Sequence, residues 1–215
     1  DSMRNKFASP VLGLPQEEPV FTLNQYPVKL LEGFMSNSRN IIVVKKEAKS
    51  QFRIEKNEYA NPQVVVHISG QTVQEILDTI QSNDSLIINK IKESEIKVLQ
   101  DKIKQDSLFD IKPIADKFNI RLNIPVKYKM VLKGKKFIWL KKEITSGNLS
   151  LIFYQIPITS VKDNNNAVKS ITRIRDSIGR IYIHGAVPRT RMITEPAFSP
   201  YLSKTKIYSK ETFET

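Results

Sequence analysis

The chain has 215 residues and a formal net charge of +12, with 34 Lys and Arg against 22 Asp and Glu. Its hydrophobic content of 40% is enough to build a core, which excludes a disordered chain. The absence of cysteine excludes disulfides, thiolate nucleophiles and cysteine-based zinc sites, and no apolar run approaches the about 20 residues that span a bilayer.

The first residues, DSMRNKF, are typical of the last turns of a helix. We therefore expect the chain to be a fragment. After a proline-rich loop, β-branched runs at 40–47 and 63–70 predict two buried strands. The polar stretch 48–62 between them predicts a connecting segment without a strand.

Two amphipathic helices are predicted next, as covers for a sheet. Thr72 and Glu75 form the pattern of a capping box, which starts a helix that runs to about residue 81. The polar residues 82–85 are expected to interrupt it, and a second helix is predicted over 86–105.

A similar order of elements follows from residue 108 onward. Residues 110–118 predict a helix that tolerates Pro113 in its first turn and ends at Asn119 in the left-handed region. Further strands are predicted within 120–125, 128–143 and 146–158, followed by a helix over 164–183 and a possible strand at 205–209.

Both parts of the chain contain a helix ending in Lys-Phe, an extended proline-bearing segment, strands and a covering helix. This order predicts an α+β protein of two related half-domains that arose by internal duplication. Each half is expected to have a mixed or antiparallel sheet covered by helices. The predicted halves are residues 1–107 and 108–215.

The two histidines, His67 and His184, lack a second ligand at helical spacing, so we expect neither a metal site nor a cofactor. His67 alternates with valines, which indicates a hydrogen-bonded core or edge residue. Gly is scarce, and no segment fits a nucleotide-binding loop. His184 near Ser177 or Asp176 is the one sequence-local arrangement that leaves a hydrolase open.

The segment KGKKFIWLKKE, residues 133–143, has two interpretations. Trp139 and its aromatic neighbour, flanked by lysines, are typical of a stacking platform for a single-stranded nucleic acid or a sugar. However, apolar residues on both faces are typical of a central strand with solvated lysines at its ends, and we favour this interpretation.

Arginines gather in the segment 173–191 of an otherwise lysine-rich chain. The guanidinium group suits a carboxylate, phosphate or sulfate, so this cluster predicts an anion-binding surface. The alternative is that arginines such as Arg175 pair with neighbours such as Asp176 and hold a loop. The arginines concerned are Arg173, Arg175, Arg180, Arg189 and Arg191.

Several segments, taken together and in this order, resemble a family of uncharacterised lipoproteins of Gram-negative bacteria, the domain of unknown function 4837. They are KFASPVLGLPQEEPVFTL, RNIIVV, NPQVVVHISG, ADKFNIRLNIPVKYKM, FIWLKKE, RDSIGRIYIHGA and RMITE. The resemblance runs along nearly the whole chain. It implies that an N-terminal strand and a C-terminal part of the family's domain lie outside this chain. It also implies a location on the periplasmic side of the cell envelope, through a lipidated cysteine upstream, and provides no catalytic residues to transfer.

These observations together predict a non-catalytic, envelope-associated binding or structural module rather than an enzyme. We expect the partner to be an anionic ligand or an envelope protein, with membrane association only through the upstream lipid anchor. The first alternative is a protein that binds nucleic acid or an anionic glycan, and of these two ligands nucleic acid is the less expected. The second alternative is a hydrolase. The predicted ligand-binding residues, near the junction of the halves, are Trp139, Arg175, Tyr182, Arg189 and Arg191.

Overall fold

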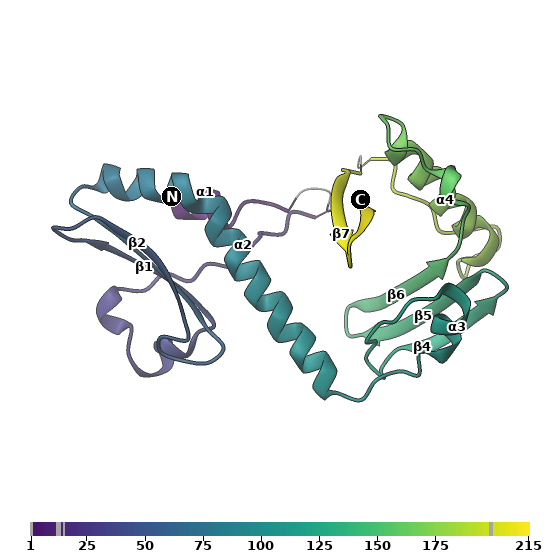
Figure 1. The fold of residues 1–215 in the computed structure, drawn as a ribbon, viewed down its shortest axis with the longest axis horizontal. Helices are drawn as coiled ribbons and strands as arrows, with labels where there is room; N and C mark the ends of the chain where they lie inside the picture. The colour runs from purple at the N-terminus through teal and green to yellow at the C-terminus, as the bar shows by residue number, and fades with distance from the viewer. Residues whose placement is uncertain (1, 12–13, 15, 198–199) are drawn as a thin grey trace. The chain divides into compact units, whose positions relative to one another are not determined.

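The computed structural model describes residues 2–11, 14, 16–197 and 200–215 (Figure 1). The described residues form two three-stranded sheets, one two-stranded sheet and helices, which confirms the α+β class. The chain forms two compact units. The first unit comprises Asp1–Pro10 and Pro19–Tyr154, and the second comprises Val11–Glu18 and Gln155–Thr215.

The first sheet is mixed and has the strand order β1-β3-β2. Strand β1 (Asn40–Lys46) runs parallel to β3 (Val64–Gly70), and β2 (Gln51–Lys56) runs antiparallel to β3. The prediction of a connection without a strand between β1 and β3 is therefore wrong. Phe52 and Ile54 alternate with polar residues, and this period of two lets β2 face the core on one side and solvent on the other.

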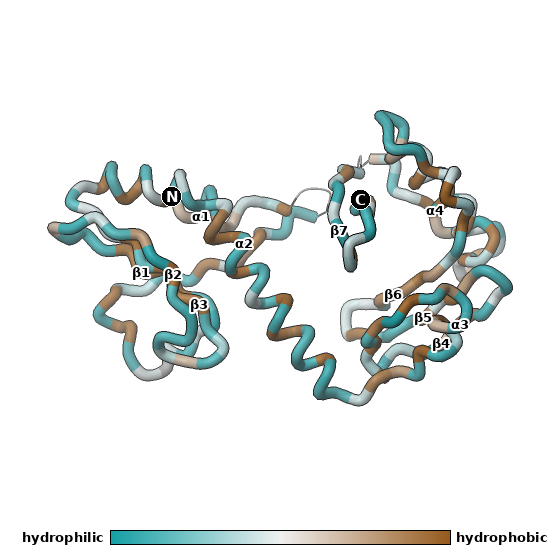
Figure 2. Tube along the Cα trace, viewed as in Figure 1, coloured by the Kyte–Doolittle hydropathy of each residue, from teal (hydrophilic) through white to brown (hydrophobic). Residues whose placement is uncertain are grey.

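A single helix, α2 (Val73–Gln105), covers one face of this sheet. It starts at Thr72, whose hydroxyl oxygen accepts a hydrogen bond from the backbone N–H of Glu75 at 3.1 Å, as predicted. The predicted break at 82–85 is wrong, because Asn83 donates its side-chain N–H to the Thr79 carbonyl inside the helix. Apolar residues recur along its whole length (Figure 2).

The core of the first sheet explains why α2 continues through that polar stretch. The spacing of the buried isoleucines places them on one face of the helix both before and after residues 82–85. They pack with Phe7 of α1 (Ser2–Phe7) and with the apolar face of β3. The isoleucines are Ile76, Ile80, Ile87 and Ile91.

The second sheet of the first unit is an antiparallel meander, β4-β5-β6, in which β5 (Phe137–Ile144) is the central strand. Its outer strands are β4 (Lys129–Gly134) and β6 (Gly147–Tyr154). Helix α3 (Lys112–Phe118) packs on the face that carries Ile138 and Leu140. Because the first sheet is mixed and this one is antiparallel, strand order does not establish the internal duplication, which stays a prediction.

The connection from α3 to β4 differs from the predicted one. Asn119 ends α3 in the left-handed region at φ 53°, as expected. However, residues 120–125 form no strand, and the pairing there is limited to an isolated bridge between Leu108 and Pro125. Pro125 lacks the N–H that a longer ladder requires, although the neighbouring Ile124 is buried in the core of this sheet.

The second unit contains α4 (Ala167–Tyr182), the short 3-10 helix η3 (Ile158–Ser160) and a terminal hairpin. Strands β7 (Ser203–Ile207) and β8 (Lys210–Glu214) pair antiparallel around a two-residue turn. Tyr208 and Ser209 in this turn have φ values of 48° and 67°, which are the positive values that tight hairpins require.

After α4, residues 183–194 fold back onto the helix. The backbone N–H of Met192 donates to the Ile183 carbonyl at 3.0 Å, and the N–H of Thr194 donates to the Asp176 carboxylate at 2.7 Å. Gly179 makes this close approach possible, because a Cβ atom there would lie 2.4 Å from the Met192 carbonyl oxygen. We call residues 183–194 the return segment.

We expect Gly179→Ala to destabilise the second unit. Alanine favours a helix interior by about 1 kcal/mol over glycine, but a clash with backbone atoms costs about 1–3 kcal/mol and outweighs that gain. Hydrogen exchange should accelerate at the amides of Met192 and Thr194. Lys169→Ala, at an exposed position of the same helix, is the control and should leave exchange unchanged; protection retained in Gly179→Ala would contradict the packing described above.

Candidate functional site

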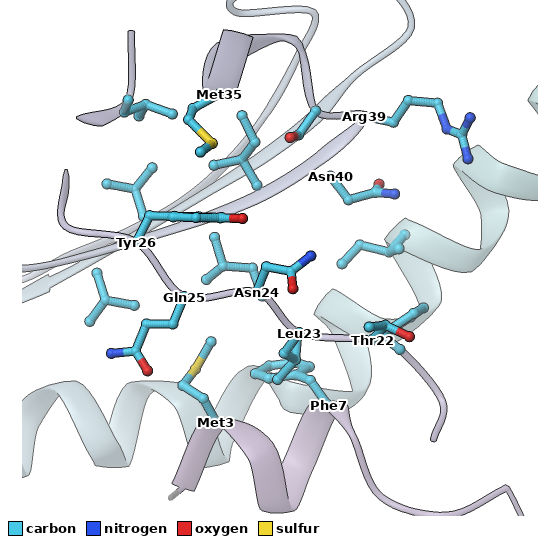
Figure 3. Close-up of a pocket in the computed structure, with 18 of the residues that line it drawn as sticks. Met3, Phe7, Thr22, Leu23, Asn24, Gln25, Tyr26, Met35, Arg39 and Asn40 are labelled. Atoms are coloured by element: carbon cyan, nitrogen blue, oxygen red, sulfur yellow. The ribbon is translucent and has the colours of Figure 1, made fainter. Parts of the chain in front are cut away.

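A pocket of about 1200 Å³ lies in the first unit (Figure 3). Its walls come from α1, the chain from Val20 to Leu31, strand β1 and one side of α2 near Ile91 and Glu95. All of these elements belong to the first unit, so the pocket is formed within a single compact unit. We call it the β1 groove.

The free edge of β1 forms one wall of the β1 groove. The N–H of Val64 donates to the Arg39 carbonyl at 2.8 Å, and the N–H of Glu47 donates to the Gly70 carbonyl at 2.9 Å. Successive residues of a strand direct their backbone groups to opposite edges, so odd-numbered residues face β3 and Ile42 and Val44 face outward. Among the described residues, no hydrogen bond reaches those outward backbone groups.

Another wall of the groove is the segment 22–26, which forms no helix or strand. Phe21 donates its N–H to the Phe7 carbonyl at 3.0 Å, but within the described part of the chain no backbone hydrogen bond involves the five residues that follow. Pro27 ends the segment and contributes no N–H. In Figure 3 these residues follow one another across the middle of the view, with Arg39 and Asn40 above them and Met3 and Phe7 below.

Apolar side chains cover much of the groove between these walls. Met3, Phe7 and Leu23 belong to, or pack against, the core of the first sheet. Tyr26 and Leu30 are 53% and 47% exposed although they line the pocket. The groove therefore offers apolar surface that the protein itself does not cover.

A polar cluster lies at one end of the groove. The Arg39 guanidinium donates two hydrogen bonds to the Glu95 carboxylate, at 3.0 and 2.8 Å, and the Asn40 side-chain N–H donates a third at 2.6 Å. Hydrogen bonds from Arg39 hold the pKa of Glu95 below its ordinary value, and the same contact raises the pKa of Arg39. The cluster is therefore charged and internally paired at neutral pH.

The other polar atom of Asn40 has no partner. Its Oδ1 oxygen is buried and accepts no hydrogen bond among the described residues, while its Nδ2 is committed to Glu95. A buried acceptor without a donor costs about 1–3 kcal/mol, so such atoms are rare in native structures. The oxygen has almost no solvent-accessible surface, so it is not an open contact point for a ligand in the groove.

The structure places Trp139 on β5, where its indole N–H donates to the Ser150 hydroxyl of β6 at 3.0 Å. Trp139 is partly buried, and β5 is central with apolar residues on both faces, which confirms the favoured structural interpretation of this strand. Of the flanking lysines, Lys142 lies over the Tyr128 ring at 5.9 Å.

The other four predicted ligand-binding residues lie in the second unit, on α4 or in the return segment. Arg175 donates to the Thr194 hydroxyl at 2.7 Å and lies 3.8 Å from the Asp176 carboxylate, so it helps to hold the return segment. Arg191 forms an isolated β-bridge with His184, Arg189 is exposed, and Tyr182 ends α4. A ligand-binding role for these residues and Trp139, near the junction of the halves, stays a prediction.

The histidines have different surroundings. His67 Nε2 lies 2.5 Å from a Glu58 carboxylate oxygen, which confirms the prediction of a hydrogen-bonded core or edge residue. Burial opposes ionisation of Glu58, but hydrogen bonds with His67 and Tyr59 and the charge of Arg53 hold its pKa below its ordinary value.

His184 is exposed, and its Nε2 lies 3.1 Å from the Arg180 carbonyl oxygen. Asp176 instead accepts hydrogen bonds from Thr194, so the contacts of these two residues do not assemble the acid-base pair that a hydrolase would need. Within the described ranges, no group of three or more His, Asp and Glu residues could hold a metal ion.

Sequence reasoning missed the β1 groove. The run Ile41–Val44 was recognised as a strand, but neither its position at a sheet edge nor its contact with residues 22–26 follows from local sequence. A weak signal was available in the closely spaced Pro19 and Pro27, which favour an extended chain between them.

We expect Glu95→Gln to lower the free energy of unfolding at pH 7 by about 1 kcal/mol or less, because a partly exposed ion pair contributes little. The pKa of Glu95 is lowered in the folded state. Its contribution to the free energy of unfolding is therefore fully present above about pH 4.3, the ordinary pKa of glutamate, and is lost as the pH falls further. Denaturant unfolding from pH 2.5 to 7 should show the two proteins converging in acid.

Glu93→Gln is the control for this series, because Glu93 lies on the same helix, is 66% exposed and pairs with the neighbouring Lys90 of that helix. It should leave stability within about 0.5 kcal/mol of the parent chain at every pH. A Glu95→Gln deficit that persists unchanged at pH 2.5 would contradict the electrostatic explanation.

Comparison with known proteins identifies two families. Residues 1–104 match the model of a domain of unknown function (DUF8532), so the expected resemblance to a single family along nearly the whole chain needs correction in this part. No curated protein and no solved structure matches the chain. Residues 107–215, more than half of the chain, match a domain of unknown function (DUF4837), and the chain therefore belongs to the DUF4837 family.

Proposed function

We propose that this protein is a non-catalytic binding module of the bacterial cell envelope and that its ligand occupies the β1 groove. The observation that carries the proposal is the exposed apolar lining of the pocket, at whose end Arg39, Asn40 and Glu95 form a hydrogen-bonded polar cluster. Ligand sites characteristically combine a mostly apolar lining with a few placed polar groups. The ligand therefore has an apolar body.

The surroundings of the groove support binding rather than catalysis. The charged side chains at its end, Arg39 and Glu95, are paired with each other, and the pKa of Glu95 is lowered rather than raised toward neutrality. A carboxylate held ionised in this way is a poor general acid at neutral pH. Neither histidine lines the pocket.

The proposed envelope location rests on the resemblance of the chain to a family of uncharacterised bacterial lipoproteins, and the match of residues 107–215 to DUF4837 supports the family part of that resemblance. Among the described residues, no helix combines the length and apolar character needed to cross a membrane. We propose that a lipidated cysteine upstream of the chain anchors the natural protein on the periplasmic side of the envelope.

The groove is tested by titration with the fluorescent probe 1-anilinonaphthalene-8-sulfonate, which has an apolar aromatic body and an N–H group. We expect saturable binding to the wild-type chain. Leu30→Gln should weaken it about tenfold, the effect of losing the burial of one leucine side chain.

Leu86→Gln is the matched control, because Leu86 is 45% exposed, against 47% for Leu30, and lies on α2 outside the pocket. It should leave probe affinity unchanged. Equal effects of the two substitutions, or no saturable binding to the wild-type chain, would refute the proposed site.

The location is tested separately by expressing the natural protein from its own gene in bacteria supplied with radiolabelled palmitate. We expect the label to enter the protein and the protein to sediment with the membrane fraction. Substitution of the proposed acceptor cysteine by alanine should abolish both. An unlabelled protein in the soluble fraction would remove the envelope assignment and leave the groove proposal untouched.

A further inference from the structure

We propose that the occupant of the β1 groove is an extended polypeptide segment of a partner protein, which joins the first sheet as an additional strand beside β1. This inference rests on the proposed function and names the class of ligand. Its first basis is the free edge of β1, where the outward N–H and C=O groups of Ile42 and Val44 have no partner among the described residues. A row of donors and acceptors with a two-residue repeat is complementary to another polypeptide backbone.

The second basis is the segment 22–26, which lines the same pocket. These residues form no helix or strand, and across the described ranges their backbone groups have no hydrogen-bond partner. The β1 edge and this segment, which line the same pocket, therefore both offer unpaired backbone groups. A small apolar molecule would leave most of these groups unsatisfied, at a cost for each one that becomes buried.

The size of the groove also favours a polymer. Its volume of about 1200 Å³ exceeds the about 300–1000 Å³ that is typical of sites for small molecules. Four successive residues, Ile41–Val44, line it. Because neighbouring side chains of a strand point to opposite faces, the groove extends along the edge of β1 on both faces. A guest strand with apolar residues on both faces fits this environment.

A partner peptide fits better than a second copy of the chain. The β1 edge of a second copy would bring its own segment 22–26, which lines the same pocket, into the contact. An edge-to-edge dimer would therefore have to accommodate two such segments. An isolated extended segment needs only the space that the groove already has.

The experiment starts from a phage-displayed library of random dodecapeptides, panned on the full 215-residue chain. The best peptide is synthesised, and its affinity is measured by fluorescence anisotropy. We compare Val44→Pro with Val44→Ala in the protein. Proline removes the outward N–H of residue 44 and leaves the odd-numbered residues paired with β3, whereas alanine trims the side chain and keeps the N–H.

Strand addition predicts that Val44→Pro weakens peptide binding at least fivefold more than Val44→Ala does, the effect expected for about one hydrogen bond. A second arm does not depend on how well the proline variant folds. In it, N-methylation of a central peptide residue should weaken binding to the wild-type chain at least fivefold, because the methyl group removes a backbone donor and blocks the approach of β1.

Three outcomes would overturn the inference. Equal effects of the two Val44 variants, together with an N-methylated peptide of full affinity, would show that side chains alone are recognised. Recovery of no peptide while the fluorescent probe still binds the groove would reject a polypeptide occupant and leave the proposed function standing. A wild-type dimer that Val44→Pro converts to monomer would assign the edge to a second copy.

Discussion

Parallel pairing between β1 and β3 is the constraint on which the first unit depends. Parallel neighbours need a crossover connection, and in this chain the connection contains β2, which pairs with the other edge of β3. Strand β3 thereby becomes central and almost fully buried, and β1 keeps one unpaired edge. The burial of β3 beneath α2 holds β1 in place, so the free edge is a consequence of how the core is built.

Buried and charged polar groups gather beside that free edge, at one end of the groove. Arg39, Asn40 and Glu95 satisfy one another through three hydrogen bonds, and the lowered pKa of Glu95 reflects these contacts. The single buried acceptor that they leave is Asn40 Oδ1, within the described part of the chain. The molecule thus tolerates an unsatisfied group beside exposed apolar surface, a combination that is better explained by binding than by stability.

The second unit uses its charged residues differently. The arginine-rich segment was predicted to bind an anion or to hold a loop, and Arg175 and Asp176 both contact Thr194 of the return segment. The contact between Gly179 and the Met192 backbone shows how closely that segment approaches α4. Part of the arginine cluster is therefore structural, and an anion-binding role for the remainder stays a prediction.

Local sequence was enough to predict the elements whose signals lie within a few residues. The capping box at Thr72, the left-handed Asn119 and the central strand β5 all follow from short patterns, because each depends on contacts between near neighbours or on apolar residues at consecutive positions. These patterns also predicted the α+β class correctly.

Tertiary structure alone decided which strand lies at an edge, whether the polar residues 82–85 interrupt a helix, and which distant segments meet at a groove. Packing of isoleucines against β3 overrides the weak helix preference of that polar stretch, and the pairing of β1 depends on residues more than 20 positions away. Strand pairing and burial are long-range interactions, so the short patterns that identify an element do not contain the identity of its neighbours.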